Sequence, residues 1–428
     1  MQFLKATIPG EYLDGFLYRG HLYLLRIDSS MVLVNWDELV SARCPGPAEQ
    51  VDPLAEMLFI DNSLARVDRR MLRWSGYPEL RDFFNKRLRA YQDIDFSLRA
   101  PINPVDLGGR AVHSIELYFS HLWLAGEAGV SMCQYGPGYH RKGRRSTITP
   151  VISGHAFSAT PERRFLWVSQ RGMTIGFPIE KIASDRVNVN FGSPWELPFS
   201  ALTVGWHWSD PTFASRDELR SRAFVYADWL EPDKPLARLS AEDRDTTEQR
   251  KAAVSKSSSD AIMIGGKKTY LEIELGDLAR SRVFCSRERA IVQKSSGLTA
   301  LDWQYDFSRS DLGVSEDRSE HGDAERVLIS TFGWVVEGSL GVVAYTRQGC
   351  TSLAQGEVIQ VRTFPSSIRY ENIVLIVLED RIEILSMLDY DFLLAPGDRI
   401  RSIGRRSEFY SRWHDDSSEK TTAFRKIA

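Results

Sequence analysis

The chain has 428 residues, of which 43% are hydrophobic and 26% are charged, and its formal net charge is −3. This composition is typical of a globular protein with a large core, and it provides no overall positive charge that would attract nucleic acid or an anionic membrane. The longest aliphatic run, residues 373–378, is far shorter than the ~20 residues that span a membrane. We expect no contact with a membrane, and any binding of nucleic acid must be local.

Cysteine usage indicates a reducing compartment. The four cysteines, Cys44, Cys133, Cys285 and Cys350, are far apart in the sequence, and no C-x-x-C pair suggests zinc or redox chemistry. The first residues also lack the apolar core of a signal peptide. We therefore expect free thiols in a cytoplasmic protein.

One pattern recurs along the chain: an apolar segment, a short turn with Gly, Asp or Arg, and a second apolar segment. Alternation of apolar and polar residues on both sides of a short polar break predicts a β-hairpin. The copies lie at residues 22–34, 117–132, 165–177, 283–292, 334–345 and 374–385. The near-continuous apolar run 373–378 predicts a strand that is covered on both faces.

The clearest copy, residues 122–132, resembles the blade hairpins of the β-propeller superfamily, and the weaker copies extend that resemblance over most of the chain. Most copies begin about 40 to 60 residues after the previous one, close to the spacing of propeller blades. We predict an all-β protein in one domain, 1–428, with the architecture of a β-propeller. The count is about seven blades, with six or eight as alternatives, together with a short helical insertion and long polar loops.

The segment 45–111 is too long for one blade and predicts a helix-containing insertion or an additional irregular blade. Apolar residues at steps of three and four follow Pro78, which predicts an amphipathic helix that ends near Tyr91. Alternatively, residues 57–60 and 71–74 form one more hairpin. The N-terminal strand, residues 3–8, is expected to close the ring by pairing with a strand near 399–403.

Three segments are too polar to bury much surface. We expect a mobile polar loop at 233–260, a second polar loop at 306–326 and a polar tail at 414–428.

Motifs of catalysis are absent or incomplete. The glycine spacing of residues 138–143 resembles a phosphate-binding loop, but Arg144 and Arg145 stand where Lys and Ser or Thr are needed. An odd offset on a strand points His113 and Glu116 to opposite faces, and His155 has no second histidine at ligand spacing in the sequence. We expect no catalytic residue, metal or cofactor. A hydrolase with a site assembled in a central funnel remains an alternative, because catalytic triads are defined by geometry.

One local feature is a candidate binding site. Residues 135–145 combine basic side chains, which bind phosphates, with rings that stack on bases. The candidate residues are Tyr135, Tyr139, His140, Arg141, Lys142, Arg144 and Arg145. If the loop binds a ligand, an acidic partner protein is as good a candidate as RNA or DNA. A solvated loop is the alternative.

We expect a non-catalytic interaction or scaffold subunit of a cytoplasmic, bacterial multi-protein system that binds a partner protein with one propeller face. The resemblance to propellers implies this role, because propellers without a family signature often serve in such systems, including those with an ATPase partner. The first alternative is a nucleic-acid-binding accessory protein that uses the basic loop 139–145, and the second is the hydrolase.

Overall fold

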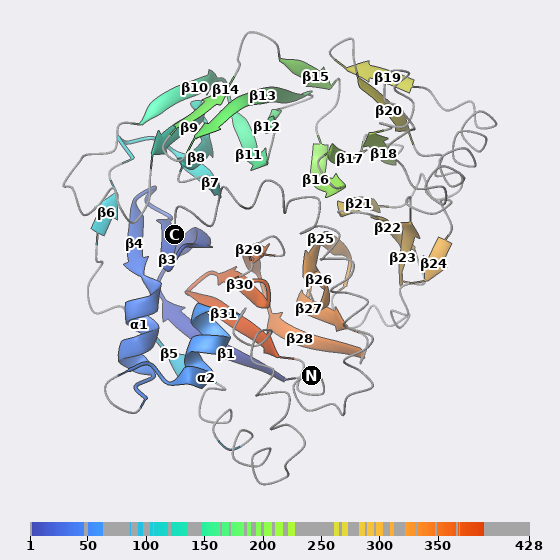
Figure 1. Cartoon of the computed structure of the whole chain (residues 1–428). Helices are drawn as coiled ribbons and strands as arrows, with labels where there is room; N and C mark the ends of the chain where they lie inside the picture. Colours follow the sequence, from blue (N-terminus) through green and yellow to red (C-terminus); the bar gives the residue numbers. More distant parts are fainter. Residues whose placement is uncertain are drawn as a thin grey trace, which may run out of the picture.

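The structure is a computed structural model, and Figure 1 shows the whole chain. It describes residues 2–46, 50–62, 86, 93–96, 103–105, 107–118, 121–134, 148–162, 165–170, 173–183, 186–189, 194–197, 201–207, 210–216, 221–226, 261–264, 268–272, 282–286, 289–294, 297–302, 309–311, 322–330, 332–346, 349–364, 367 and 369–388. Within these residues the protein is all-β, as predicted, with seven separate sheets, none of which closes on itself. The sheets follow one another around the molecule in chain order (Figure 1).

The first four sheets use strands between residues 12 and 272. The first contains β2 (Tyr12–Tyr18), β3 (His21–Arg26), β4 (Met31–Asn35) and β6 (Asn103–Val105). The second contains β7 (Val112–Tyr118), β8 (His121–Gly126), β9 (Gly129–Gln134) and β10 (Thr149–Ser153). The third contains β11 (Ala156–Glu162), β12 (Phe165–Gln170), β13 (Met173–Ala183) and β14 (Arg186–Val189), with β15 (Trp195–Leu197) paired to β13. The fourth contains β16 (Ala201–His207), β17 (Asp210–Arg216), β18 (Ser221–Tyr226), β20 (Lys268–Glu272) and β19 (Ala261–Ile264).

Three more sheets complete the described chain. The fifth contains β21 (Arg282–Ser286), β22 (Arg289–Lys294), β23 (Gly297–Asp302) and β24 (Arg309–Asp311). The sixth contains β25 (Ala324–Ser330), β26 (Gly333–Gly338), β27 (Gly341–Thr346) and β28 (Gly349–Gln355). The seventh contains β29 (Val358–Thr363), β30 (Ile373–Leu378), β31 (Arg381–Leu388), β1 (Gln2–Pro9) and β5 (Asp93–Asp95). Every described ladder is antiparallel except that between β1 and β5.

The predicted hairpins are all present as antiparallel strand pairs. Strand β30, predicted to be covered on both faces, is buried at every residue. One close approach between neighbouring strands depends on glycine. Gly341, at the start of β27, has φ +140°, and a Cβ there would collide with the carbonyl oxygen of Ala354 on β28. Only glycine allows the two backbones to approach this closely.

We call the strand that begins each series of hairpins the leading strand. The leading strands are β2, β7, β11, β16, β21, β25 and β29. In six of the seven described leading strands the register shifts one residue after the strand begins, and β21 is the exception. Such a β-bulge leaves one residue unpaired and redirects its side chain. The bulge residues are Leu13, His113, Phe157, Leu202, Glu325 and Ile359.

Leading strands also join neighbouring sheets. Strand β2 contacts β7, β7 contacts β11, β16 contacts β21, β21 contacts β25, β25 contacts β29, and β29 contacts β2. The third and fourth sheets meet where β15 contacts β19. Where side chains are described, apolar ones fill the spaces between adjacent sheets, and one such cluster joins β27 and β28 to β29, β30 and β31.

The N-terminal strand belongs to the last sheet. Along its whole length β1 pairs with β31, from Gln2 beside Leu388 to Pro9 beside Arg381, and β5 covers its other edge. The expectation that the N-terminal strand pairs with a C-terminal one is confirmed, but its predicted location near 399–403 is wrong. Residues 381–388 pair with β1 instead, because their alternating apolar residues pack in the same core as Leu4, Ala6 and Ile8.

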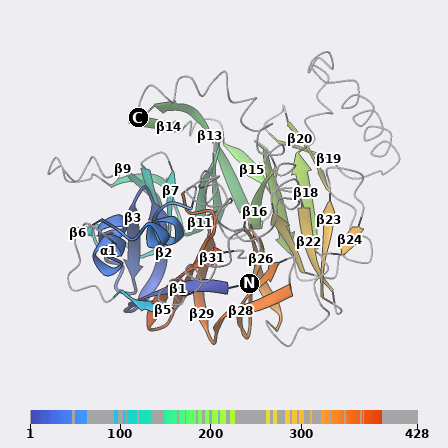
Figure 2. The same ribbon diagram turned by 60° about the horizontal axis from the view of Figure 1, so that its bottom comes forward.

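Two short helical segments pack beside the first and seventh sheets. Helix α1 (Trp36–Arg43) lies next to β3 and β4 (Figure 1 and Figure 2), and the side chain of Asn35 accepts a hydrogen bond from the amide of Glu38 at its start. Helix α2 (Pro53–Ala55) leads into the π-helix η2 (Glu56–Ile60). The indole of Trp36 donates a hydrogen bond to the carbonyl oxygen of Phe59 at 2.7 Å. The alternative hairpin that used residues 57–60 as a strand is therefore wrong.

Other parts of the predicted insertion and loops are described only in places. Of the expected helix from Pro78 to Tyr91, only Lys86 lies in the described part, and it is helical. The loop 233–260 and the tail 414–428 lie outside the described residues. Within 306–326, β24 and the start of β25 are strands rather than loop. None of the helices described is long and apolar enough to cross a membrane.

Replacing Ile8 by Ala should destabilise the whole protein, because Ile8 is fully buried in the core that β1 shares with β31. Loss of such a side chain costs about 2–5 kcal/mol in free energy of unfolding, which urea denaturation will measure. Thr7→Ala, on the other face of β1, is the control and should cost less than about 1 kcal/mol. Equal effects of the two changes would contradict this packing.

The cysteines should differ in reactivity. Burial raises the pKa of Cys44 to about 11 and that of Cys133 to about 12, whereas Cys350 is exposed. Because the thiolate is the reactive form, at pH 8 a maleimide should modify Cys350 rapidly and should spare Cys44 and Cys133 in the native protein. Peptide mapping by mass spectrometry will identify the modified positions, with urea-unfolded protein as the control. Rapid labelling of Cys133 in the native protein would be inconsistent with its burial.

Candidate functional site

The predicted basic loop cannot be placed. Tyr135, Tyr139, His140, Arg141, Lys142, Arg144 and Arg145 all lie outside the described residues, so the binding role of residues 139–145 stays a prediction. The flanking strands are described: β9 ends at Gln134, and β10 begins at Thr149.

A different surface forms at the end of the sheets where leading strands begin. Because the strands are antiparallel, the turns β3–β4, β8–β9, β26–β27 and β30–β31 lie at this same end. Among the residues whose burial is described, the exposed charged side chains at this end are carboxylates, and we call it the acidic face. They are Glu11, Asp28, Glu127, Asp323, Glu325, Glu357, Glu379 and Asp380. The described basic residues here, Arg26, Arg110, Arg326 and Arg381, are only partly exposed.

Cross-sheet contacts align the beginnings of neighbouring leading strands. The amide of Ile115 on β7 donates a hydrogen bond to Asp14 on β2 at 3.1 Å. Arg326 on β25 donates a hydrogen bond to the side chain of Gln360 on β29. Asp14, Arg326 and Gln360 each follow the bulge in their strand directly. The bulges therefore lie at the same height along neighbouring leading strands. As a result, the acidic face extends over several sheets.

Large apolar side chains are exposed on this face. Among the described residues, the exposed large hydrophobic side chains are Ile27 at 49%, Phe157 at 49% and Leu340 at 52%. Ile27 lies in the β3–β4 turn, Leu340 lies in the β26–β27 turn, and Phe157 is the bulge residue of β11. All three thus lie at the strand-start end, although they belong to three different sheets.

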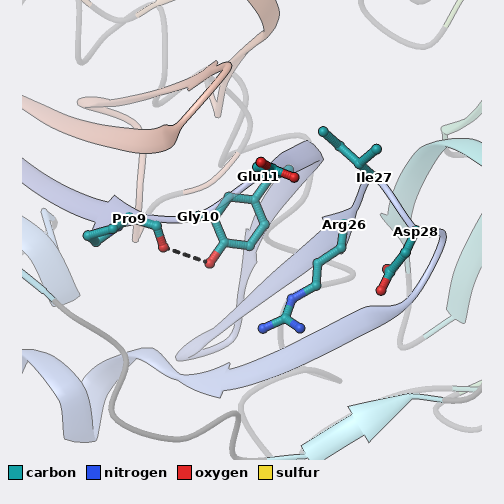
Figure 3. Close-up of a pocket in the computed structure, with 7 residues that line it drawn as sticks. Pro9, Gly10, Glu11, Arg26, Ile27 and Asp28 are labelled. Carbon is teal, nitrogen blue, oxygen red and sulfur yellow. Dashed lines mark hydrogen bonds between the residues drawn. The ribbon is translucent and has the colours of Figure 1, made fainter.

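Ile27 borders an open pocket of about 460 Å³, which Figure 3 shows. The β1–β2 turn provides one wall with Glu11, and the β3–β4 turn provides the other with Arg26 and Asp28. The phenol of Tyr12 donates a hydrogen bond to the carbonyl oxygen of Pro9 at 3.2 Å and so holds the first turn in place. The pocket therefore combines an apolar side chain with charged groups at its mouth.

Leu340 has acidic neighbours too. The amide of Ser339 donates a hydrogen bond to the carbonyl oxygen of Asp323 at 3.2 Å, and the amide of Gly356 donates one to the carbonyl oxygen of Leu340 at 3.3 Å. These backbone bonds fix Leu340 between the turn that carries Asp323 and the turn that carries Glu357.

Phe157 lies beside two histidines. His113 is the bulge residue of β7, and His155 directly precedes β11. Their Nε2 atoms are 3.3 Å apart, and the ring of His155 meets that of Phe157 edge to face with centroids 4.8 Å apart. The sequence shows no histidine partner for His155, because 42 residues separate the two. Only the contact of β7 with β11 brings them together.

Beneath the acidic face, Arg362 on β29 links three leading strands. Its guanidinium donates two hydrogen bonds to the carboxylate of Asp14 on β2, at 2.7 and 2.6 Å. It donates one more to Glu116 on β7 and one to the carbonyl oxygen of Ile115, both at 2.6 Å. The guanidinium also lies over the ring of Phe16, 5.1 Å from its centroid.

The charges of this cluster depend on one another. Burial alone would lower the pKa of Arg362, but the carboxylates of Asp14 and Glu116 outweigh it and raise that pKa, so the guanidinium is charged. Burial raises the pKa of Glu116, and Arg362 opposes the shift. Removal of the arginine would leave two carboxylates in a poorly solvated place. The cluster therefore acts as a structural link between three sheets.

The sequence matches no family model and no curated protein. The structure resembles the AfRom2 CNH domain with a TM-score of 0.32 and 10% identity, over 66% of this chain and 96% of that domain. It also resembles PorZ, described as an essential bacterial surface component of the type-IX secretion system of Porphyromonas gingivalis, with a TM-score of 0.42 and 11% identity, over 89% of this chain but only 38% of PorZ. The computationally designed Ika8 protein gives a TM-score of 0.44 and 7% identity, over 90% of this chain and 100% of its own. Likenesses this weak support no argument about function.

Replacing Arg362 by Met should lower the free energy of unfolding by about 3–5 kcal/mol, because it leaves the buried Asp14 and the partly buried Glu116 without their counter-charge. Urea denaturation at pH 7 will measure the change. Arg369→Met is the control: Arg369 is also 2.6 Å from its carboxylate, Asp37, but both side chains are about one-third exposed, so the loss should be about 1 kcal/mol. A similar loss in both variants would show that the Arg362 cluster is not the stronger link.

Proposed function

We propose that the protein is a β-propeller that acts as a non-catalytic interaction subunit and binds a partner protein through its acidic face. The seven described sheets would be its blades, with the leading strands innermost. Three features support the architecture: neighbouring leading strands contact one another except β11 and β16, whose sheets meet through β15 and β19; β29 returns to β2; and β1 completes the last sheet. A ring closed by strands from both ends of the chain would hold its faces rigid.

The exposure of Ile27, Phe157 and Leu340 on one face carries the functional proposal. Single apolar side chains are common on protein surfaces and need no explanation. Here, however, the exposed ones come from separate sheets and lie at the same end. Ile27 and Leu340 have carboxylates nearby, and Phe157 lies beside His155. An interface that buries apolar anchors within a polar rim has this composition.

Charge defines the chemistry of the partner. The exposed carboxylates of the acidic face are spread over several turns, while the described arginines there are only partly exposed. Arg381, for example, donates hydrogen bonds to Asp380 and Glu383, both at 2.8 Å. Such a face would attract a surface that offers lysines or arginines around apolar side chains, and the attraction would mainly speed association.

The setting proposed for this subunit is a cytoplasmic, bacterial multi-protein system in which the partner is an ATPase or another subunit. Purification of the tagged protein from its native host will test that setting, because the partner would be recovered with it. The partner's own sequence would then show whether it carries a basic and apolar segment.

A photo-crosslinking amino acid at position 340 should capture the partner in host cells, whereas the same group at position 38 should not. Leu340 lies on the acidic face, and Glu38 is an exposed residue of α1, away from the strand-start turns. Mass spectrometry of the crosslinked bands will identify the captured protein. Crosslinks from position 38 alone would contradict the assignment of the face.

The triple variant Ile27→Ser, Phe157→Ser, Leu340→Ser should weaken binding of the captured partner by at least about tenfold, since buried apolar anchors dominate interface energies. The charge variant Glu11→Lys, Glu127→Lys, Glu357→Lys should mainly reduce the association rate. Surface plasmon resonance at two salt concentrations separates the two effects, and Glu38→Lys is the control. Undiminished binding by both triple variants would exclude the acidic face as the interface.

A further inference from the structure

We propose that His113 and His155 form a binding site for a divalent transition-metal ion, with Zn²⁺ as the ion to test first. The two histidines come from neighbouring sheets, His113 from β7 and His155 from the residue before β11. Their Nε2 atoms lie 3.3 Å apart. Imidazole nitrogen is a preferred ligand of zinc, copper and nickel.

The distance between the two nitrogens fits a shared metal ion. Zinc binds histidine nitrogen at about 2.0–2.1 Å in tetrahedral sites, so two ligands of one ion are separated by about 3.4 Å. The observed separation is within about 0.1 Å of that value. The two rings are inclined by 77°, so they are not stacked face to face.

The backbone holds both histidines in position before any ion binds. His113 lies between the paired residues Val112 and Ser114, and its bulge directs it out of the ladder. His155 is followed at once by Ala156, which pairs with Gln170. Because the positions are set by two sheets, little conformational freedom would be lost when both rings bind one ion.

The site is accessible. Both histidines are exposed, so an ion can enter from solvent and water can complete its coordination. An ion held in this way would tie the second sheet to the third beside Phe157. It would also present open coordination positions on the acidic face. Metal binding by the isolated protein does not depend on the proposed partner.

A competing explanation uses the same geometry. One imidazole can donate its Nε2–H directly to the Nε2 of the other, and the 3.3 Å distance allows that bond. Metal binding requires both nitrogens to be free of protons, so the two explanations predict different responses to added metal.

The decisive experiment is calorimetric titration of the full chain with ZnCl₂. We expect one zinc ion to bind per protein chain. The melting temperature should also rise, because ligands that bind only the native state stabilise it. His113→Asn and His155→Asn should each weaken that binding by about tenfold or more, since the second ligand is no longer supplied within the same molecule. The double variant keeps neither ligand and should show no zinc binding at this site.

His21→Asn is the matched control. His21 lies at the β2–β3 turn, at the end of the first sheet that is opposite to the acidic face. Its substitution should therefore leave the affinity for zinc unchanged. Circular dichroism and the melting temperature without metal will show that each variant is folded. As a second readout, Co²⁺ should give the visible absorption of a tetrahedral site in the wild type and in His21→Asn. That absorption should be missing in His113→Asn, in His155→Asn and in the double variant. Absence of zinc binding, or equal affinity of the wild type and both variants, would overturn the proposal and leave the hydrogen-bonded pair.

Discussion

Arg362 joins the leading strands of three sheets through partners that are remote in the sequence. Its partners Asp14 and Glu116 lie 348 and 246 residues away in the sequence. Flat apolar contacts between sheets tolerate sliding, whereas a bidentate arginine–carboxylate pair fixes both distance and direction. The seventh, first and second sheets therefore cannot slide along one another in the direction of their strands. The alignment of their bulges, and so the continuity of the acidic face, depends on that restraint.

The acidic face follows from how the repeated strands begin. A bulge after the first residue redirects one side chain, and His113, Phe157 and Glu325 are exposed for this reason. The adjoining turns are exposed, and several of them carry carboxylates beside the bulges. Buried positions further along the strands are constrained by packing, while these exposed positions are not. Variation at the strand ends can thus change what the surface binds and leave the core unaffected.

Local pattern predicted the local structure well. Alternation located the hairpins, and the unbroken apolar run 373–378 identified a strand that is buried throughout. Residues 57–60 were also apolar, but Asp52 and Pro53 start a helix just before them, since the Asp52 side chain accepts a hydrogen bond from the amide of Leu54. Short apolar runs do not distinguish strand from helix, and here the capping residues decided.

The sites could not be predicted in the same way, because their parts are remote in the sequence. The Arg362 cluster and the histidine pair each depend on contacts between sheets, and a single sequence contains no sign of which residues meet. The strand that pairs with β1 shows the same limit. Both 381–388 and 399–403 lie near the C-terminal end, and only packing with Leu4, Ala6 and Ile8 selects the first.

The place of β1 in the last sheet has a consequence for synthesis on the ribosome. Lys5 on β1 and Glu383 on β31 form an ion pair across 378 residues of chain. At about 5–20 residues per second, on the order of 20 to 80 seconds pass between translation of the two strands. During that time β1 has an unpaired edge, which is a template for wrong pairing. Its charged Lys5 discourages such contacts, and a chaperone that shields the emerging N-terminus would raise the yield of native protein.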